Sequence, residues 1–272
     1  MIRYRSFSPE AGRPKELVLL DVDGTIFPDM PDEFTGVAYW HMYENGLLKT
    51  GSEEEVELLR NLRSQYGFHP DMAERKKYYS ELNPRFDAQI SGRSRATVDR
   101  IADDIIEQRL EDAFEDVMQE ISAWQDTGRY VGYISGSPNF LIQALKRATN
   151  ADIATGTRFF TSGGGTYHPS RRTETRGRDK HLIAESMLID LSTQRLRKLG
   201  RGAVSPMSRP SLTDFDSEDL FTLRSSYGDT VNDESMMTMA LDPVAVRPKP
   251  DLREIANKER WRVIDEPGEQ TP

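Results

Sequence analysis

Two aspartates spaced two residues apart follow a short apolar run near the start of the chain. Asp21 and Asp23 come directly after Leu17-Val18-Leu19-Leu20, and Gly24 lets the backbone turn after them. Four consecutive apolar residues indicate a strand of a parallel sheet, buried on both faces. Ligands of such sheets bind at the carboxyl ends of the strands, and Mg²⁺ prefers hard oxygen ligands. The pair therefore predicts a magnesium site. The alternative is a strand that ends in an Asx turn with two solvated aspartates.

A hydroxyl group follows a second predicted strand at residues 130–134. Ser135-Gly136-Ser137 comes directly after it, and we expect Ser137 to cap a helix that has Pro138 at its first position. A hydroxyl and free amides at the start of a helix can bind phosphate. A simple helix cap is the alternative interpretation of the same residues.

Two acids and a lysine complete the set of candidate site residues. Asp229 and Asp233 follow a predicted strand at residues 221–227 and open a helix at residues 234–240. Acids at a helix start can also serve only the helix dipole, which is the alternative. Lys180 opens a further helix, although a lone lysine is usually a solvated charge.

Together these residues fit the hydrolysis of a phosphate monoester. That reaction needs a nucleophile, a cation, a hydrogen-bond donor and an acid for the leaving oxygen. Asp21 can attack phosphorus and form an aspartyl phosphate. Asp21, the main-chain carbonyl of Asp23 and Asp229 can hold Mg²⁺. Asp23 can protonate the leaving alcohol and then activate water.

The remaining candidates would bind the phosphoryl group or support the site. Ser135 and neighbouring amides would hold phosphoryl oxygens, and Lys180 would contact phosphate as a point charge. Asp233 would orient Lys180 or a metal-bound water. The other residues that we place in or around the site are Gly24, Thr25, Gly136 and Asn232.

The chain resembles the haloacid dehalogenase-like hydrolase superfamily in four motifs, which occur in the order Asp21-Val22-Asp23-Gly24-Thr25, Ser135-Gly136-Ser137, Lys180 and Gly228-Asp229-Thr230-Val231-Asn232-Asp233. The segments 241–248 and 261–264 are similar to the phosphoserine-phosphatase-like branch, subfamily IB. The resemblance extends over residues 16–266 and is weak between the first two motifs. It implies an α/β fold with a modified Rossmann-like parallel sheet flanked by helices, an inserted all-helical C1 cap, Mg²⁺ dependence and the roles given above.

A long segment without strands separates the first two motifs. Parallel-sheet domains use short connections, so about 100 residues of helical spacing predict an insert. We expect an α/β core at residues 1–27 and 128–272 and a helical cap at residues 28–127. Within the cap, Ser52 and Glu55 form a predicted capping box, and one long helix is expected over residues 95–124.

Two features depart from the phosphoserine phosphatase pattern. Those enzymes carry a glutamate nine residues after the nucleophile, which helps to bind the amino group of the substrate. Met30 occupies that position here, with Asp29, Asp32 and Glu33 nearby, so the serine-binding role is not transferred. The polar loop at residues 201–219 also looks longer than the corresponding family segment.

Composition restricts the possible partners and the compartment. The chain has 272 residues, a formal net charge of −9 and no cysteine. The acidic balance argues against a nucleic-acid surface, and the lack of cysteine excludes disulfides and thiolate sites. No apolar run approaches the roughly 20 residues that span a bilayer, and residues 1–10 have no signal-peptide character. We therefore expect a cytoplasmic protein, monomeric or dimeric, that binds neither nucleic acid nor membrane.

The predicted function is Mg²⁺-dependent hydrolysis of a small phosphorylated metabolite, because a cap of this size would exclude bulky polymers. Transfer of the phosphoryl group to another alcohol is one alternative. A non-catalytic module that binds a phosphometabolite is another. The combination of Asp21 and Asp23 argues against the module, because a pure binder needs no acid two residues from the nucleophile.

Overall fold

The protein is built on one sheet. We describe residues 14–69, 71–173, 179–198, 211, 215–216 and 218–266 of a computed structural model. The strands in these residues are β1 (Glu16–Leu20), β2 (Tyr130–Pro138), β3 (Ile153–Thr161), β4 (Tyr167–Thr173), β5 (Thr222–Gly228), β6 (Asp242–Val246) and β7 (Arg262–Ile264). They form a seven-stranded sheet in the order β4-β3-β2-β1-β5-β6-β7. All neighbouring pairs are parallel except β3 and β4. The predicted α/β fold is confirmed.

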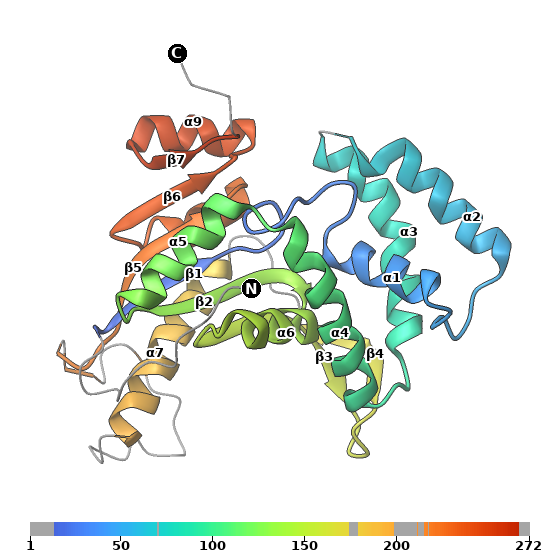
Figure 1. The fold of residues 1–272 in the computed structure, drawn as a ribbon, viewed down its shortest axis with the longest axis horizontal. Helices are drawn as coiled ribbons and strands as arrows, with labels where there is room; N and C mark the ends of the chain where they lie inside the picture. The colour runs from blue at the N-terminus through green and yellow to red at the C-terminus, as the bar shows by residue number, and fades with distance from the viewer. Residues whose placement is uncertain are drawn as a thin grey trace.

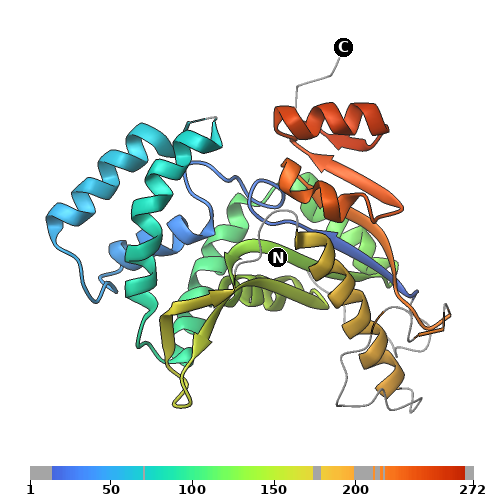
Figure 2. The same cartoon turned by 180° about the vertical axis from the view of Figure 1, so that it is seen from behind.

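The apolar run of β1 is continuous because both faces of the sheet are covered. Successive side chains of a strand point to opposite faces. Val18 and Leu20 belong to the apolar cluster that includes α5 (Glu115–Asp126) and α6 (Asn139–Thr149). Leu17 and Leu19 belong to the cluster on the other face, with α7 (Lys180–Lys198). Figures 1 and 2 show these helices on opposite sides of the strands.

Two short helices complete the edge of the sheet at β6 and β7. They are α8 (Glu234–Met237) and α9 (Pro250–Glu259). Pro250 lies in the first turn of α9, where proline needs no hydrogen-bond partner. Leu252 and Ala256 of α9 pack against Ala245 of β6. Helix α8 was expected over residues 234–240, but it is shorter and ends at Met237.

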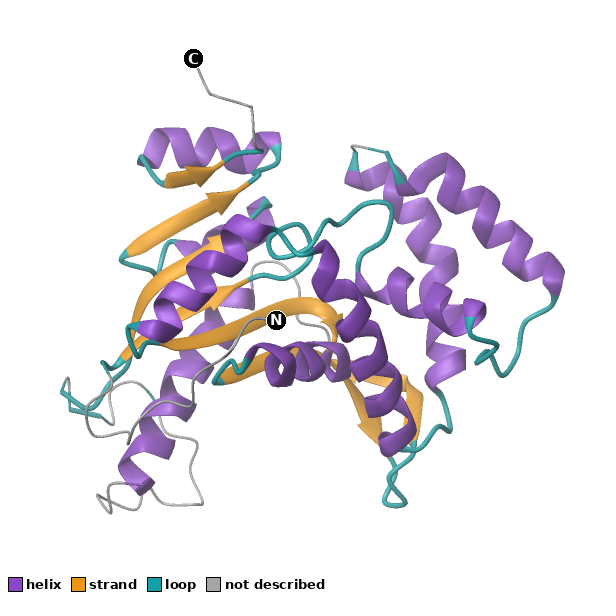
Figure 3. Ribbon diagram, in the orientation of Figure 1, coloured by secondary structure: helices purple, strands orange, loops and turns teal. Residues whose placement is uncertain are grey.

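The segment between the first two motifs is helical, as Figure 3 shows. Its helices are α1 (Phe34–Glu44), α2 (Glu53–Leu62), a π-helix (Arg63–Gly67), α3 (Met72–Ile90), α4 (Arg95–Arg109), a 3₁₀ turn (Leu110–Asp112) and α5. The predicted capping box of α2 is confirmed: the Ser52 hydroxyl accepts a hydrogen bond from the Glu55 amide, and the Glu55 carboxylate accepts one from the Ser52 amide.

The helices of this segment fall into two groups. In Figure 1, α1, α2 and α3 form a unit beside the sheet, whereas α4 and α5 lie along it. Helix α4 contacts α6, and α5 contacts β2. Backbone hydrogen bonds join Gly92 and Arg93 to Tyr167 of β4. The boundaries at residues 27 and 127 stay a prediction, and these contacts favour a cap unit that ends near residue 92.

The prediction of one helix over residues 95–124 is wrong. The structure has two helices that are separated at residues 110–114. The Phe114 amide donates to the Ile26 carbonyl at 2.9 Å, in the loop that follows Asp23. This tertiary contact pulls the backbone out of the helical path, although the apolar spacing continues across the break.

The sequence Ser162-Gly163-Gly164-Gly165, flanked by the short segments 158–160 and 166–168, predicts a hairpin. The structure confirms it as the turn between β3 and β4. Most of the polar loop at residues 201–219 lies outside the described residues. None of the helices that the structure describes has the length and apolar character required to cross a membrane.

The packing of β1 generates a stability prediction. Leu19 of β1 is fully buried on the face of the sheet that α7 covers. Leu19→Ala should therefore lower the free energy of unfolding by about 2–5 kcal/mol. Leu58→Ala on the exposed side of α2 is the matched control, with an expected change within about 0.5 kcal/mol. Urea unfolding followed by circular dichroism measures both. A cost below about 1 kcal/mol for Leu19→Ala would contradict the described core.

Candidate active site

Three predicted site residues meet at the carboxyl ends of β1 and β5. These strands are parallel neighbours with Leu20 opposite Tyr227, so the residues that follow them leave the sheet together. Carboxylate oxygens of Asp21, Asp229 and Asp233 lie within 4.8 Å of one another. All three side chains are buried, and we call them the acidic cluster.

Lys180 reaches the acidic cluster from the start of α7. Its Nζ donates to Asp21 Oδ1 at 2.7 Å and to Asp233 Oδ1 at 2.5 Å. The lysine side chain is itself buried. One amine thus faces three carboxylates, which leaves an excess of negative charge in a site that water hardly reaches.

The pKa values of these groups reflect burial and mutual repulsion. Burial raises the pKa of Asp21 to about 8; Lys180 opposes the shift and Asp233 adds to it. Burial, together with the charges of Asp233 and Asp21, also raises the pKa of Asp229 well above its ordinary value. Burial disfavours the charged form of Lys180, but Asp21 and Asp233 outweigh it and raise the lysine pKa. The site therefore favours additional positive charge.

The acidic cluster fits a metal ion. Asp229 Oδ2 is buried and has no hydrogen-bond partner among the described residues. Gly24 lies against the same oxygen: a Cβ at Gly24, which has φ +83°, would stand 2.2 Å from Asp229 Oδ2. A buried carboxylate oxygen without a partner is costly, and a set of oxygen ligands suits a hard divalent cation. Asp21, Asp229 and Asp233 can therefore bind a metal ion.

Asp233 is held by contacts on both carboxylate oxygens. Oδ1 accepts from Lys180, whereas Oδ2 accepts from the amide and the hydroxyl of Thr230, both at 3.1 Å. Asp229 has fewer contacts: the Thr25 hydroxyl approaches Oδ1 at 3.5 Å. Of the two acids, Asp229 is thus the one with a free oxygen to offer a cation.

Asp23 lies outside the acidic cluster and has different neighbours. Its Oδ1 accepts from the Phe34 amide at 2.8 Å, in the first turn of α1. Its Oδ2 accepts from the hydroxyls of Ser137 at 2.7 Å and Ser135 at 3.2 Å. The two aspartates of the first motif therefore have separate environments, although only one residue stands between them.

The prediction that Ser137 caps a helix is wrong. Strand β2 continues to Pro138, which pairs with Thr157 of β3, and α6 begins at Asn139 without a side-chain cap. The Ser137 hydroxyl donates to Asp23 instead. Sequence reasoning therefore missed Ser137 as a site residue. The available signal was its spacing of two from Ser135, which places both hydroxyls on one face of a strand.

The other predicted residues occupy varied positions. The Gly24 amide donates to the Phe27 carbonyl at 2.7 Å, and the Gly136 carbonyl accepts from the Thr157 hydroxyl at 2.6 Å. Asn232 is exposed on the turn that precedes α8. Gly24 therefore leaves space beside Asp229, and the Gly24 amide is engaged in the hydrogen bond to Phe27.

Sequence reasoning also missed a buried ion-pair network at the edge of the site. Asp29 Oδ2 accepts from Arg75 of α3 at 2.6 Å, and Asp29 Oδ1 lies 3.3 Å from Lys249 Nζ. The Lys249 amide donates to the Asp229 carbonyl at 2.8 Å. This network links the helical insert to the acidic cluster. Arg75 stands in a highly charged stretch of α3, and nothing in that stretch marks it as buried.

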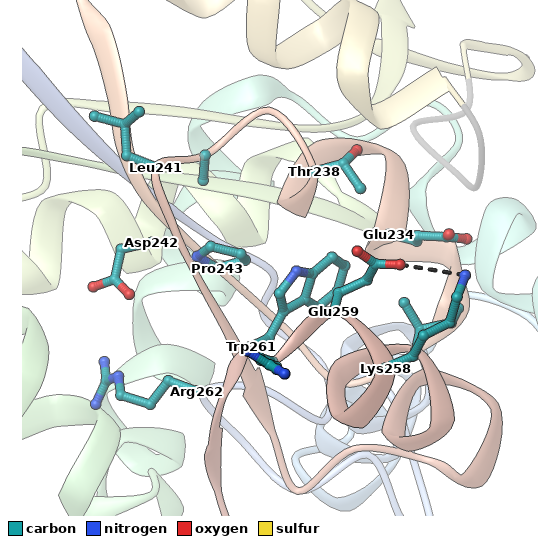
Figure 4. Close-up of a pocket in the computed structure, with 12 residues that line it drawn as sticks. Glu234, Thr238, Leu241, Asp242, Pro243, Lys258, Glu259, Trp261 and Arg262 are labelled. Atoms are coloured by element: carbon teal, nitrogen blue, oxygen red, sulfur yellow. Dashed lines mark ion pairs between the residues drawn. The ribbon is translucent and has the colours of Figure 1, made fainter.

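A cavity of about 500 Å³ lies away from these residues, between α8, α9 and the starts of β6 and β7. Figure 4 shows Trp261 and Pro243 among its walls. Because β6 begins at Asp242 and β7 at Arg262, the cavity lies at the amino ends of the strands. The acidic cluster lies at the opposite, carboxyl ends.

Comparison with known structures shows that the fold is shared. A protein of unknown function from Bordetella pertussis Tohama I matches with TM-score 0.61 and 18% identity, over 93% of this chain and 99% of that chain. A HAD family hydrolase from Salmonella enterica subsp. enterica serovar Typhi matches with TM-score 0.50 and 15% identity, over 94% and 69%. A phosphoserine phosphatase also matches, with TM-score 0.45 and 18% identity, over 94% and 95%.

Sequence comparison identifies the family. A search of curated proteins found no match. The family model described as haloacid dehalogenase-like hydrolase matches residues 18–196, which is more than half of the chain. The match includes the first three motifs and the whole helical insert. The chain therefore belongs to the haloacid dehalogenase-like hydrolase family.

Proposed function

We propose that this protein is a phosphomonoesterase that uses Mg²⁺ to hydrolyse the phosphate ester of a small metabolite. The observation that supports this most strongly is the convergence of Asp21, Lys180 and Asp229, from three separate elements, around one unpaired carboxylate oxygen. Membership of a hydrolase family agrees with it. The helical insert, predicted over residues 28–127, includes the unit of α1, α2 and α3, which would act as the cap and limit the size of the substrate.

Asp21 is the nucleophile in this proposal. Lys180 holds Oδ1, so Oδ2 is the oxygen that we assign to the attack on phosphorus. The new bond between Asp21 and phosphorus forms as the bond from phosphorus to the alcohol oxygen breaks. The product is an aspartyl phosphate, and the alcohol oxygen leaves with the bonding electron pair.

Asp23 is the general acid and base. It gives a proton to the leaving alcohol oxygen and then takes one from the water that hydrolyses the aspartyl phosphate. Its hydrogen bonds from Phe34 and Ser137 fix its orientation. Two carboxylates in different environments can serve in two different roles, which matches the separate surroundings of Asp21 and Asp23.

Mg²⁺ would be held by Asp21, Asp229 and the main-chain carbonyl of Asp23. When bound, the ion neutralises charge on the phosphate and on the carboxylates, so that one anion can approach another. Asp233 orients Lys180, since both of its carboxylate oxygens are engaged. Lys180 and Ser135 would contact phosphoryl oxygens.

The assignment of Asp21 predicts a large loss of activity in Asp21→Asn. The amide keeps the shape of the side chain but is a poor nucleophile, so kcat for p-nitrophenyl phosphate should fall by roughly 10³-fold or more. Asp103→Asn, at an exposed ion pair on α4, is the control and should match the wild type. Circular dichroism checks that both variants fold. Activity of Asp21→Asn within tenfold of the wild type would remove Asp21 as the nucleophile.

The raised pKa values predict a pH-dependent effect of Mg²⁺ on stability. The folded protein retains protons on Asp21, with a pKa of about 8, and on Asp229, whereas the unfolded chain loses them near pH 4. Without metal, both groups make the folded state less stable as the pH rises above about 4, and the contribution of Asp21 extends to about pH 8. A cation that binds these carboxylates must displace their protons. It therefore binds more tightly at high pH, where the protons dissociate readily.

The rise in melting temperature caused by Mg²⁺ should therefore be larger near pH 8.5 than near pH 6, by several degrees. Scanning fluorimetry of protein treated with EDTA, with and without added Mg²⁺, measures it. Asp229→Asn should lose most of the effect. An equal rise at both pH values, retained in Asp229→Asn, would contradict the proposed cation site.

A further inference from the structure

A second cavity adjoins the loop that carries Asp21 and Asp23. Its volume is about 360 Å³, and its walls include Gly24, Asp29 and Met30 from the first motif and the linker that follows it. Arg247 and Lys249, from the segment that follows β6, also line the cavity. Gly24 also lies beside Asp229, because a Cβ at Gly24 would stand 2.2 Å from Asp229 Oδ2. The alcohol part of an ester with its phosphoryl group at Asp21 can therefore extend into this cavity.

Arg247 lines the cavity and has a guanidinium nitrogen without a hydrogen-bond partner among the described residues. Its side chain is 10% exposed, and Nη1 is buried with no hydrogen-bond partner among the described residues. Nε lies 3.2 Å from Glu266 Oε1 but has no hydrogen-bond partner among the described residues either. Nη2 donates to both carboxylate oxygens of Asp116, at 3.0 and 3.2 Å, and the group lies 3.9 Å from the centre of the Phe114 ring. A buried donor without an acceptor is costly, so its position calls for a ligand that accepts hydrogen bonds.

The backbone at Arg247 is strained. Its φ is +42°, in the left-handed region that non-glycine residues rarely adopt. The Arg247 amide donates to the Ile264 carbonyl at 2.7 Å, which holds this turn at the end of β6. Strain of this kind is concentrated at functional sites. Here it accompanies the placement of an arginine in the wall of the cavity.

Lys249 adds positive charge to the same wall. Its ion-pair partner, Asp29, is shared with Arg75, so one carboxylate stands between two cations. Both carboxylate oxygens of Asp29 are thereby engaged. Arg247 is paired with Asp116 and Glu266, and Arg253 with Asp265. The acidic partners offset much of the positive charge of this wall. We therefore expect the cavity to recognise a ligand through hydrogen-bond donors and not through its net charge.

We propose that this cavity binds an anionic group on the alcohol part of the substrate, either a carboxylate or a second phosphate. Arg247 Nη1 and Lys249 Nζ donate to that group, and Met30 and Phe114 border the short carbon skeleton. Arginine is suited to this role because its planar guanidinium matches carboxylate and phosphate oxygens. The inference rests on the proposed function, because it places the reacting phosphoryl group at Asp21.

Matched pairs of substrates test the proposal. 3-Phosphoglycerate carries a carboxylate where glycerol 3-phosphate carries a hydroxymethyl group, and fructose 1,6-bisphosphate carries a second phosphate that fructose 1-phosphate lacks. The measured quantity is the ratio of kcat/KM for the ester that carries the additional anionic group to kcat/KM for the ester that lacks it. We expect this ratio to exceed about tenfold in the wild type for at least one pair, which identifies the preferred anion.

Three variants locate the effect. In Arg247→Gln and Lys249→Gln the ratio should fall to about twofold or less, because the donors are weakened or lost. Lys258→Gln removes an exposed cation of α9 outside this cavity and should keep the wild-type ratio. The ratio does not depend on the fraction of each preparation that is folded. A wild-type ratio near one for both pairs, or a ratio that Arg247→Gln leaves unchanged, would overturn the proposal.

Failure of the proposed function gives a different result. If p-nitrophenyl phosphate and all four esters remain intact, the phosphatase assignment falls. The anion site is then decided by isothermal titration of the same pairs. Tighter binding of the anionic member, abolished in Arg247→Gln and Lys249→Gln but not in Lys258→Gln, would support the site. Equal affinities within each pair would overturn it.

Discussion

The contact of Lys180 with Asp21 and Asp233 is the interaction on which the rest of the site depends. It joins the start of α7 to the ends of β1 and β5, so it requires both the strand order and the helix on that face. Loss of one partner from a buried ion pair costs about 3–5 kcal/mol, because the remaining charge is left unpaired. With a single amine among three buried carboxylates, the site remains short of positive charge, and a divalent cation would correct this.

The helical insert contacts Asp23, the residue that we propose as the general acid. The amide of Phe34, in the first turn of α1, donates to Asp23, so the position of the proposed acid depends on the position of α1. Asp29 makes a second connection, because it pairs with Arg75 of α3 and with Lys249 next to the acidic cluster. Asp29 and Lys249 line the cavity in which we place the alcohol part of the substrate. The helical insert thus contacts both the proposed acid and the wall of this cavity.

The sequence predicts the parts of this site that depend on local pattern. The apolar run before Asp21, the capping box at Ser52 and the glycine hairpin all depend on near neighbours, and each is confirmed. The break before α5 and the role of Ser137 depend on contacts with the loop after β1, which no periodicity reveals. The positions of Arg75 and Arg247 also depend on tertiary contacts. Each is a charged residue whose burial follows from tertiary packing alone.

Chemical trapping of the aspartyl phosphate tests the central claim most directly. Protein mixed with p-nitrophenyl phosphate and Mg²⁺ is quenched in acid and reduced with borohydride, which converts a phosphorylated aspartate to homoserine. The account predicts that mass spectrometry finds the modification at Asp21 and that it requires added substrate. Modification at Asp23 instead, or turnover that proceeds with no modified aspartate, would contradict the assignment of Asp21 as the attacking group.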